Sequence, residues 1–159
     1  MSIPSRLTNY LDQQGAHYEV CPHTHSHSSA ETARTARIQP AQLAKSVILE
    51  DDAGCVMAVV PSDKTVMLGE VARMLGRREL RLSDERRIAD VFADCELGAV
   101  PPVGMAWDME TLVDDDLEAA GTIYLEAGDH ECLLRMSHDE FHELMRSARH
   151  GHFSKMPTH

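Results

Sequence analysis

The amino-acid sequence predicts a single α/β domain of the α+β type, with a mixed β-sheet flanked by helices. The chain has 159 residues, a length that supports one compact domain. Five to seven short apolar runs are typical of strands, and helical patterns occur near both ends and in the middle. Strand and helix patterns do not alternate regularly, so a doubly wound parallel sheet is disfavoured. We expect residues 1–150 to form the domain and residues 151–159 to form a flexible tail.

The first half of the chain predicts three helices, one short strand and a β-hairpin. The hairpin has the strongest pattern, because the apolar runs 46–50 and 55–61 flank an acidic turn that ends in Gly54. Ser28 and Glu31 have the spacing of a capping box, which is typical of a helix start. The remaining elements are expected as a helix between Pro4 and Gly15, a strand over 18–21, a helix from Ser28 to about Arg37, and a helix over 68–75 that ends at Gly76.

The second half predicts short strands, two further helices and one irregular loop. Ser83 is expected to cap a helix that continues to about Phe92. Ser137 and Glu140 form a second capping box, which predicts a last helix through Arg146. Two glycines and a Pro-Pro pair exclude regular structure over 98–104. Strands are expected over 105–107, 110–113, 122–126 and 132–136, residues 79–82 are ambiguous, and the chain from Arg149 onwards is expected to fray.

Charge and hydropathy narrow the classes of function. The 15 basic and 26 acidic residues give a formal net charge of −11, so broad non-specific binding of nucleic acid is disfavoured. No apolar run approaches the ~20 residues that span a bilayer, and no secretory signal is recognisable, so we expect a cytoplasmic protein without a membrane partner. The four cysteines are widely spaced and are expected as reduced thiols: Cys21, Cys55, Cys95 and Cys132.

Three common catalytic motifs are absent from the sequence. It contains no Gly-x-Ser-x-Gly nucleophile elbow and no GxxxxGK[ST] phosphate loop. The dinucleotide-binding pattern GxGxxG is also absent. An α/β-hydrolase, a phosphate-loop nucleotide enzyme and a Rossmann dehydrogenase are therefore disfavoured.

Two groups of histidines have spacings that occur in metal sites. His23, His25 and His27 alternate, so an extended segment would place the three imidazoles on one face, where they could bind a metal. A solvated loop is the simpler explanation. His138 and His142 lie four residues apart on a predicted helix, but the Glu that follows the first His in zinc proteases is absent. We therefore expect this second pair on a surface helix.

Lys45 and the loop over 98–104 are the strongest candidates for catalytic or ligand-binding groups. Lys45 begins an apolar strand, where partial desolvation would let its ammonium hold a phosphate or polarise a carbonyl. A lysine whose charged end simply reaches solvent is the alternative. The loop glycines allow close backbone approach, and amides such as those of Ala99 and Val103 could be aimed at an oxyanion. The alternative for this loop is a rigid surface turn.

Together and in this order, these segments resemble the YbaK-type aminoacyl-tRNA deacylases, the family that also supplies the editing domain of bacterial prolyl-tRNA synthetases. The resemblance covers roughly residues 5–147, and a combination of segments carries it rather than one motif. The matching segments are 44–49 with its lysine, 56–61, the helical 68–75, the glycine–proline loop 98–104, and the strands within 121–136 that precede Ser137.

The resemblance implies a mixed, partly barrel-like sheet and hydrolysis of the ester between a wrong amino acid and tRNA, without a cofactor or a metal. The family's lysine corresponds to Lys45, which is expected as the catalytic residue. The family's glycine–proline loop corresponds to Gly98, Pro101 and Gly104, which are expected to bind substrate.

One family feature does not carry over to this sequence. In many members a serine lies in a Ser-x-Gly segment of a late strand, whereas this chain has Glu126-Ala127-Gly128 there. Serine chemistry is therefore not implied. Gly128 and His130 are expected to contribute to the substrate pocket instead, with Asp129 between them.

The resemblance suggests a mechanism without a protein nucleophile. An aminoacyl ester is activated by the neighbouring ribose hydroxyl, so the site has to place the ester, stabilise the oxyanion and admit water. Lys45 would anchor the terminal adenosine's phosphate or the ester carbonyl, and amides within 98–104 would meet the developing charge. A small pocket would exclude larger amino acids.

The expected partners are the acceptor end of aminoacyl-tRNA and an aminoacyl-tRNA synthetase, with the chain as a monomer or homodimer. A basic run over 77–87 suits tRNA phosphates or a solvated helical face. The acidic run 114–116 suits a solvated turn or a hard cation. Two other functions stay open: a catalytically silent module that binds a small molecule or nucleotide, and a histidine-rich metal-binding protein.

Overall fold

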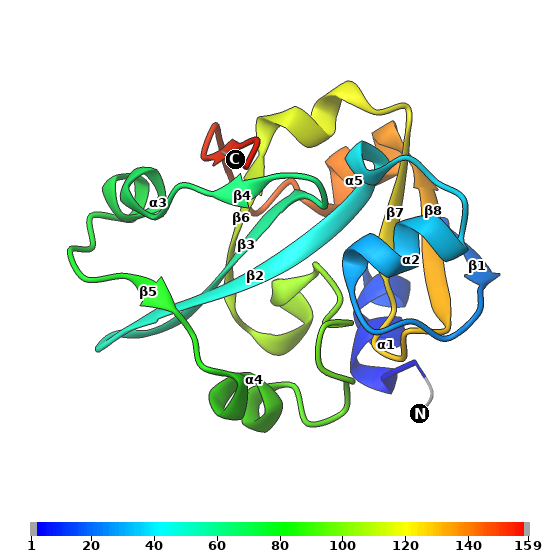
Figure 1. Ribbon diagram of the computed structural model, residues 1–159, viewed down its shortest axis with the longest axis horizontal. Coiled ribbons are helices and arrows are strands. Elements are labelled where there is room, and N and C mark those ends of the chain that lie inside the picture. The colour runs from blue at the N-terminus through cyan, green and yellow to red at the C-terminus, as the bar shows by residue number, and fades with distance from the viewer. Residues whose placement is uncertain (1–2, 158–159) are drawn as a thin grey trace.

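The computed structural model describes residues 3–157, and its centre is a mixed sheet of eight strands (Figure 1). The strands follow the order β1-β8-β7-β2-β3-β6-β9, and β5 pairs separately with β2. Their bounds are β1 (Glu19–Pro22), β2 (Leu43–Asp51), β3 (Gly54–Pro61), β5 (Arg81–Leu82), β6 (Glu110–Asp114), β7 (Thr122–Glu126), β8 (Cys132–Ser137) and β9 (Arg149–Gly151). Strands β4 (Thr65–Val66) and β10 (Ser154–Lys155) form a second, two-stranded sheet. The predicted mixed α/β class is confirmed.

Short helices surround the sheet. The α-helices are α1 (Ser5–Gln13), α2 (Ser29–Thr35), α3 (Leu68–Leu75), α4 (Glu85–Val91) and α5 (His138–Leu144), and the 3-10 helices are η1 (Pro40–Gln42), η2 (Gly104–Trp107) and η3 (Asp115–Ala119). Ser28 and Ser137 cap α2 and α5 as predicted, since each serine Oγ accepts the N–H of the residue three positions later, at 3.2 Å. Across residues 3–157, no helix has the length and hydropathy that crossing a membrane requires.

The parallel pairing between β2 and β7 is short. Only two residue pairs join these strands, at Leu43 and Ala44 of β2. The same edge of β2 pairs again only with β5, at Leu49 and Glu50. Within the described chain, residues 45–48 therefore have no strand partner on this edge, although β3 pairs with β2 along its other edge. This gap positions the cavity described below.

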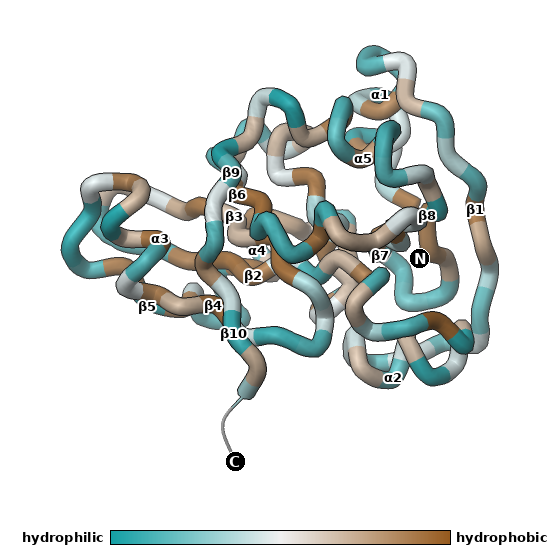
Figure 2. The backbone as a smooth tube through the Cα atoms, turned by 90° about the horizontal axis from the view of Figure 1, so that it is seen from above, coloured by the Kyte–Doolittle hydropathy of each residue, from teal (hydrophilic) through white to brown (hydrophobic). Residues whose placement is uncertain are grey.

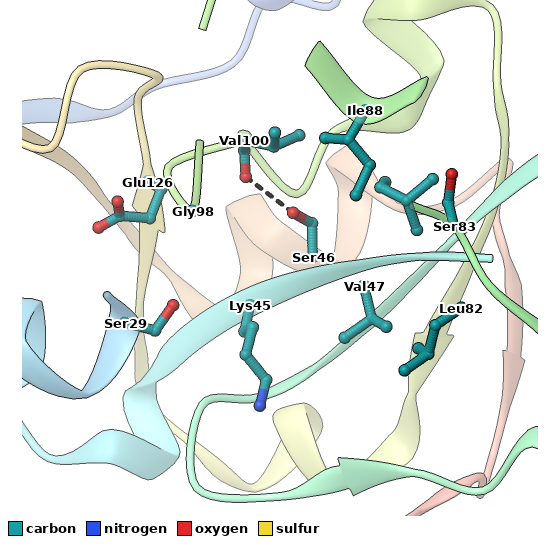
Figure 3. A pocket seen from close by; sticks show the side chains of 11 residues that line it. Ser29, Lys45, Ser46, Val47, Leu82, Ser83, Ile88, Gly98, Val100 and Glu126 are labelled. Atoms are coloured by element: carbon teal, nitrogen blue, oxygen red, sulfur yellow. Dashed lines mark hydrogen bonds between the residues drawn. The ribbon is translucent and has the colours of Figure 1, made fainter. Parts of the chain in front are cut away.

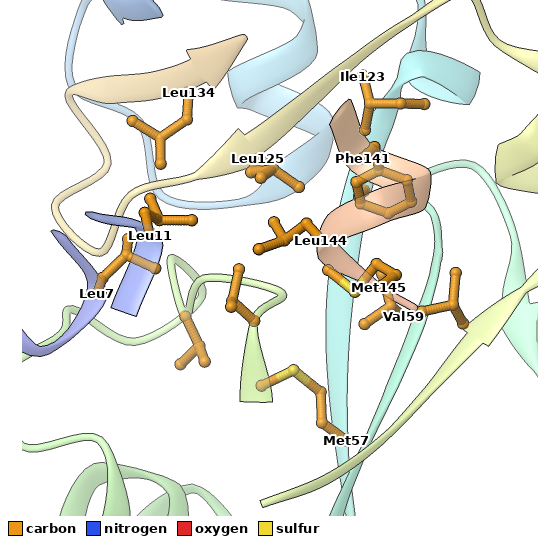
Figure 4. Packing of buried hydrophobic residues seen from close by; sticks show 14 of the residues in the cluster. Leu7, Leu11, Met57, Val59, Ile123, Leu125, Leu134, Phe141, Leu144 and Met145 are labelled. Atoms are coloured by element: carbon orange, nitrogen blue, oxygen red, sulfur yellow. The ribbon is translucent and has the colours of Figure 1, made fainter. Parts of the chain in front are cut away.

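Apolar side chains cover both faces of the sheet. The largest cluster packs α1 and α5 against β7 (Figure 4), and its members include Leu7, Leu11, Ile123, Leu125, Phe141 and Leu144. A second cluster packs Val71 of α3 against β2 and β3. Because β3 is buried from Val56 to Val60, its sequence reads as one continuous apolar run. Figure 2 shows this hydrophobic colour along the central strands and hydrophilic colour in the outer loops.

Three local predictions are wrong. Residues 105–107 form η2 rather than a strand, because three apolar residues do not distinguish these structures. Asp84 caps α4 in place of Ser83, since its Oδ1 accepts the N–H of Arg87 at 2.7 Å, whereas the Ser83 N–H donates to β2. The last helix ends at Leu144 rather than Arg146, because Met145 already leaves the helical conformation, with φ −92° and ψ 12°.

The C-terminal segment forms strands, which corrects the expectation that the chain frays from Arg149. Strand β9 pairs in parallel with β6, and β10 pairs with β4. Between them, Phe153 is fully buried and its N–H donates to Asp114 Oδ2 at 2.8 Å. Burial of an aromatic ring holds this segment against the domain. The expectation for 158–159 falls outside the described residues.

Candidate functional site

A cavity of about 230 Å³ opens where β2 separates from β7 (Figure 3). Five parts of the chain contribute its walls: β2, the start of α2, the segment from β5 to α4, the glycine–proline loop and the end of β7. The lining residues are Ser29, Lys45, Ser46, Val47, Ile48, Leu82, Ser83, Ile88, Gly98, Val100 and Glu126. Two predicted site residues, Lys45 and Gly98, thus line one cavity although they are far apart in sequence.

Lys45 is half-buried at the wall of this cavity. Its Nζ donates to the carbonyl of Lys64 at 2.8 Å and lies 3.4 Å from the carbonyl of Ser62. Burial lowers the pKa of Lys45, and nearby Asp63 partly opposes that shift. An ammonium has three N–H donors, so one remains for an oxygen of a bound ligand.

The glycine–proline loop forms the opposite side of the cavity. Ser46 Oγ donates to the carbonyl of Val100 at 2.9 Å and so ties the loop to β2 (Figure 3). Gly98 has φ +83°, and an added Cβ would lie 3.2 Å from both His130 Nε2 and the carbonyl oxygen of His27. A glycine is therefore favoured here by both conformation and space.

The other predicted site residues do not line the cavity. Pro101 is buried. An added Cβ at Gly104 would clash with Thr111 Oγ1 of β6 and would lie 3.3 Å from Met57 Cβ, so this glycine permits close packing in the core. Gly128 has φ +100° and packs against Pro4 of the N-terminal segment. His130 is only 1% exposed and lies behind the loop.

Glu126 is a lining residue whose role the sequence did not assign. It is 2% exposed, and its Oε2 lies 3.3 Å from His130 Nδ1. A charged residue that ends the apolar strand 122–126 was the available signal, because burial of a carboxylate requires a partner. Ser29 and Ser46 were missed too, since a single serine carries no signal by itself.

The remaining wall of the cavity is apolar. Val47, Leu82 and Ile88 lie together on the side away from Glu126 (Figure 3). Leu82 is 61% exposed and lies at the mouth of this apolar end. The cavity therefore has a polar end and an apolar end, as ligand sites commonly do.

The acidic run contributes to the structure of the C-terminal segment. Among residues 3–157, one group has ligand atoms close enough to share a metal ion: Asp114, Asp116 and His152. Asp114 Oδ1 already accepts the N–H of Asp116 at 2.8 Å, and Asp116 forms an ion pair with Lys64. These contacts favour a structural role for the two aspartates over metal binding.

Both predicted histidine groups contain members that contact carboxylates. His25 Nε2 lies 3.1 Å from Glu96 Oε2. His138 and His142 stack on each other and both contact Glu118, at 2.6 and 3.0 Å. Neither predicted histidine group has the ligand geometry of a metal site in the described part of the chain.

Part of the basic run supports the hairpin. Arg77 pairs with Asp51 at 3.1 Å. Glu50 contacts Arg87 at 2.9 Å and faces Arg81 at 4.0 Å. These ion pairs lower the positive charge that the run offers to a polyanion.

A family model of the aminoacyl-tRNA editing domain matches residues 23–144, so the chain belongs to the aminoacyl-tRNA editing domain family. The predicted resemblance to an editing-domain family is thereby confirmed. None of the curated proteins matches the chain significantly.

Solved structures share the fold. A protein proposed as a trans-editing enzyme for prolyl-tRNA synthetase has a TM-score of 0.81 and 22% identity, with 95% of this chain and 96% of that chain covered. The hypothetical protein APE2540 has a TM-score of 0.83 and 22% identity, with 94% and 99% covered. A proposed signal transduction protein from Marinobacter aquaeolei VT8 has a TM-score of 0.72 and 23% identity, with 96% of this chain and 31% of that chain covered. At these identities the likeness establishes the fold alone.

Proposed function

We propose that this chain is a free-standing trans-editing hydrolase that deacylates mischarged aminoacyl-tRNA carrying a small amino acid. The family membership supports aminoacyl-tRNA editing as the class of activity. The observation that carries the proposal is the meeting of Lys45 and Gly98 at one small cavity. Its volume of about 230 Å³ is below the ~300–1,000 Å³ of drug-sized sites, which suits a small side chain.

Lys45 is the proposed catalytic residue. Two carbonyls already orient its ammonium, so the charge is held in place before a substrate arrives. Its free N–H would bind the ester carbonyl or the phosphate of the terminal adenosine. Because Lys45 is half-buried, this contact would be stronger than one in bulk water.

Backbone amides of the loop are proposed to stabilise the oxyanion. The Ala99 amide, which the sequence suggested, already donates to the carbonyl of Glu96 at 3.1 Å. In the described chain, the amides of Gly98 and Val100 donate to no backbone carbonyl. We assign these two amides to the substrate oxygen.

Water is the proposed nucleophile. The ribose hydroxyl next to the ester activates it, so the enzyme gains most from positioning and charge stabilisation. The proposed substrate contact is the acceptor end of tRNA, because the net charge of −11 disfavours a broad footprint. A synthetase is the proposed partner that supplies the mischarged tRNA, in the cytoplasm.

The test is deacylation of a panel of mischarged tRNAs, including small amino acids on tRNA-Pro and alanyl, seryl and cysteinyl esters. We expect hydrolysis of a few esters, and a loss of about a hundredfold or more in kcat/KM for Lys45→Ala, since a charged contact to the reacting group is removed. Lys155→Ala is the matched control, because Lys155 is exposed on β10 and does not line the cavity. Full activity of Lys45→Ala would exclude the assigned role, and hydrolysis of no ester would exclude the proposed activity.

A further inference from the structure

The turn between β7 and β8 holds His130 in an uncommon conformation. His130 has φ 58°, a left-handed value that residues other than glycine rarely adopt. Asp129 Oδ1 fixes the turn by accepting the N–H groups of Glu131 and Cys132, both at 2.9 Å. A buried residue keeps such a conformation only where its surroundings stabilise it, and such positions cluster at functional sites.

Both ring nitrogens of His130 face acceptors. Nε2 donates to the carbonyl of Leu97 at 2.7 Å, and Nδ1 lies 3.3 Å from Glu126 Oε2. A carbonyl and a carboxylate only accept hydrogen bonds, so a proton on each ring nitrogen suits both neighbours. The Nδ1 contact has ion-pair distance but not hydrogen-bond geometry. The contact with Glu126 raises the pKa of His130, and burial opposes this shift only in part. The two side chains thus lie at ion-pair distance in a buried part of the fold.

This pair lies directly behind the wall of the cavity. Leu97, whose carbonyl binds His130, immediately precedes Gly98, and Glu126 itself lines the cavity. Ser46 holds the carbonyl of Val100 at the other end of the same short segment. The segment is therefore held on both sides of Gly98, by the His130 contact with Leu97 and by the Ser46 contact with Val100. Figure 3 shows the contact between Ser46 and Val100.

We infer that His130 is a positioning residue of the proposed deacylation site, which holds the Leu97 carbonyl and so fixes Gly98 at the cavity wall. Glu126 keeps His130 charged in this role. The effect on turnover rests on the proposed function, whereas the ion pair and the loop contact do not. The charged and titratable groups around His130 are Glu126 of β7, Glu96 before the loop, His25 after β1, and the adjoining Asp129 and Glu131.

The first test separates kcat from KM. His130→Asn removes the contact with Leu97, while asparagine tolerates the positive φ. We expect kcat to fall about tenfold to a hundredfold, with KM changed less than about threefold, because a displaced loop affects the transition state more than ground-state binding. Glu126→Gln keeps the side-chain size and should lower kcat in the same way.

His25→Asn is the matched control for this series. The His25 ring lies 5.9 Å from that of His130 and pairs with Glu96, but it does not contact the Leu97 carbonyl. The same change there should leave kcat within about twofold of wild type, since the loop contact is intact. Wild-type kcat in folded His130→Asn would overturn the inference.

The second test is independent of activity. In an NMR titration of the full chain, the His130 ring should have a pKa above its ordinary value of about 6.5, and Glu126→Gln should lower it. Hydrogen exchange of the Gly98 amide should become faster in His130→Asn. A wild-type pKa at or below about 6.5, or unchanged Gly98 exchange, would contradict the inference.

These two tests also separate failure of the inference from failure of the proposed function. If the wild type hydrolyses no ester, the proposed function fails. The His130 titration and the hydrogen exchange of the Gly98 amide then show whether His130 holds the loop. If His130→Asn does not fold, both the kinetic test and the NMR test are made on Glu126→Gln instead. A Glu126→Gln protein with wild-type kcat and an unshifted His130 would then overturn the inference.

Discussion

Substitution of Gly98 by alanine tests whether the cavity wall depends on this backbone conformation. At φ +83° an alanine is strained, which costs about 1–2 kcal/mol. The new Cβ would also lie 3.2 Å from His130 Nε2 and from the His27 carbonyl oxygen, so both neighbours would have to move by a few tenths of an ångström. We therefore expect the free energy of unfolding to fall by about 2 kcal/mol.

Urea unfolding and thermal unfolding both measure this change. For a domain of this size, a loss of about 2 kcal/mol corresponds to a Tm lower by about 4–8 °C. Deacylation by Gly98→Ala should fall about tenfold or more in kcat, because the loop moves away from Lys45 and from the reacting ester.

Gly121→Ala is the matched control for Gly98→Ala. An added Cβ at Gly121 meets nothing within 4 Å, and its φ lies outside the left-handed region. Its free energy of unfolding should therefore stay within about 0.5 kcal/mol of wild type. Equal stability of Gly98→Ala and Gly121→Ala would show that the loop does not depend on the backbone conformation of Gly98.

Three further predictions concern stability. Phe153→Ala should lower the free energy of unfolding in urea by about 3–5 kcal/mol, because the ring is fully buried; a loss below about 1 kcal/mol would contradict its place in the core. Gly69→Ala should raise the stability by about 0.5–1 kcal/mol, since Gly69 lies in α3 with open space around it, and an unchanged Tm would contradict this. Because Glu126 raises the pKa of His130, the stability from this pair is complete below the unfolded pKa of about 6.5 and is lost as the pH rises through the higher folded pKa. The difference in unfolding free energy between wild type and His130→Asn should therefore be larger near pH 6 than near pH 9, and a difference that grows with pH would have the wrong sign.

Local patterns in the sequence were sufficient where neighbouring residues decide the structure. Ser28 and Ser137 cap helices through amides three residues away, so the pattern contains both partners. The hairpin of β2 and β3 has an acidic turn between two apolar runs, and its strands pair as expected. Lys45 and Gly98 were also chosen from the sequence, but through a family resemblance rather than through any visible contact between them.

Tertiary structure decided everything that depends on distant partners. The sequence contains no sign that β2 leaves β7 after Ala44, and this separation creates the cavity. Phe153 follows a polar stretch that looked unstructured, yet its burial depends on strands far earlier in the chain. The sequence suggested that Gly104 binds a ligand, whereas the close approach of Thr111 in β6 explains why a glycine is present.

The Glu126–His130 pair also combines features visible in the sequence with a contact that forms only in the folded chain. From the sequence alone it follows that a carboxylate ends an apolar strand and that a histidine lies in the next turn. Only the folded chain brings the Leu97 carbonyl to the far side of that histidine ring, because Leu97 and His130 are 33 residues apart. Short-range rules of capping and periodicity hold no information about such a contact, since it forms when the loop and the sheet pack together.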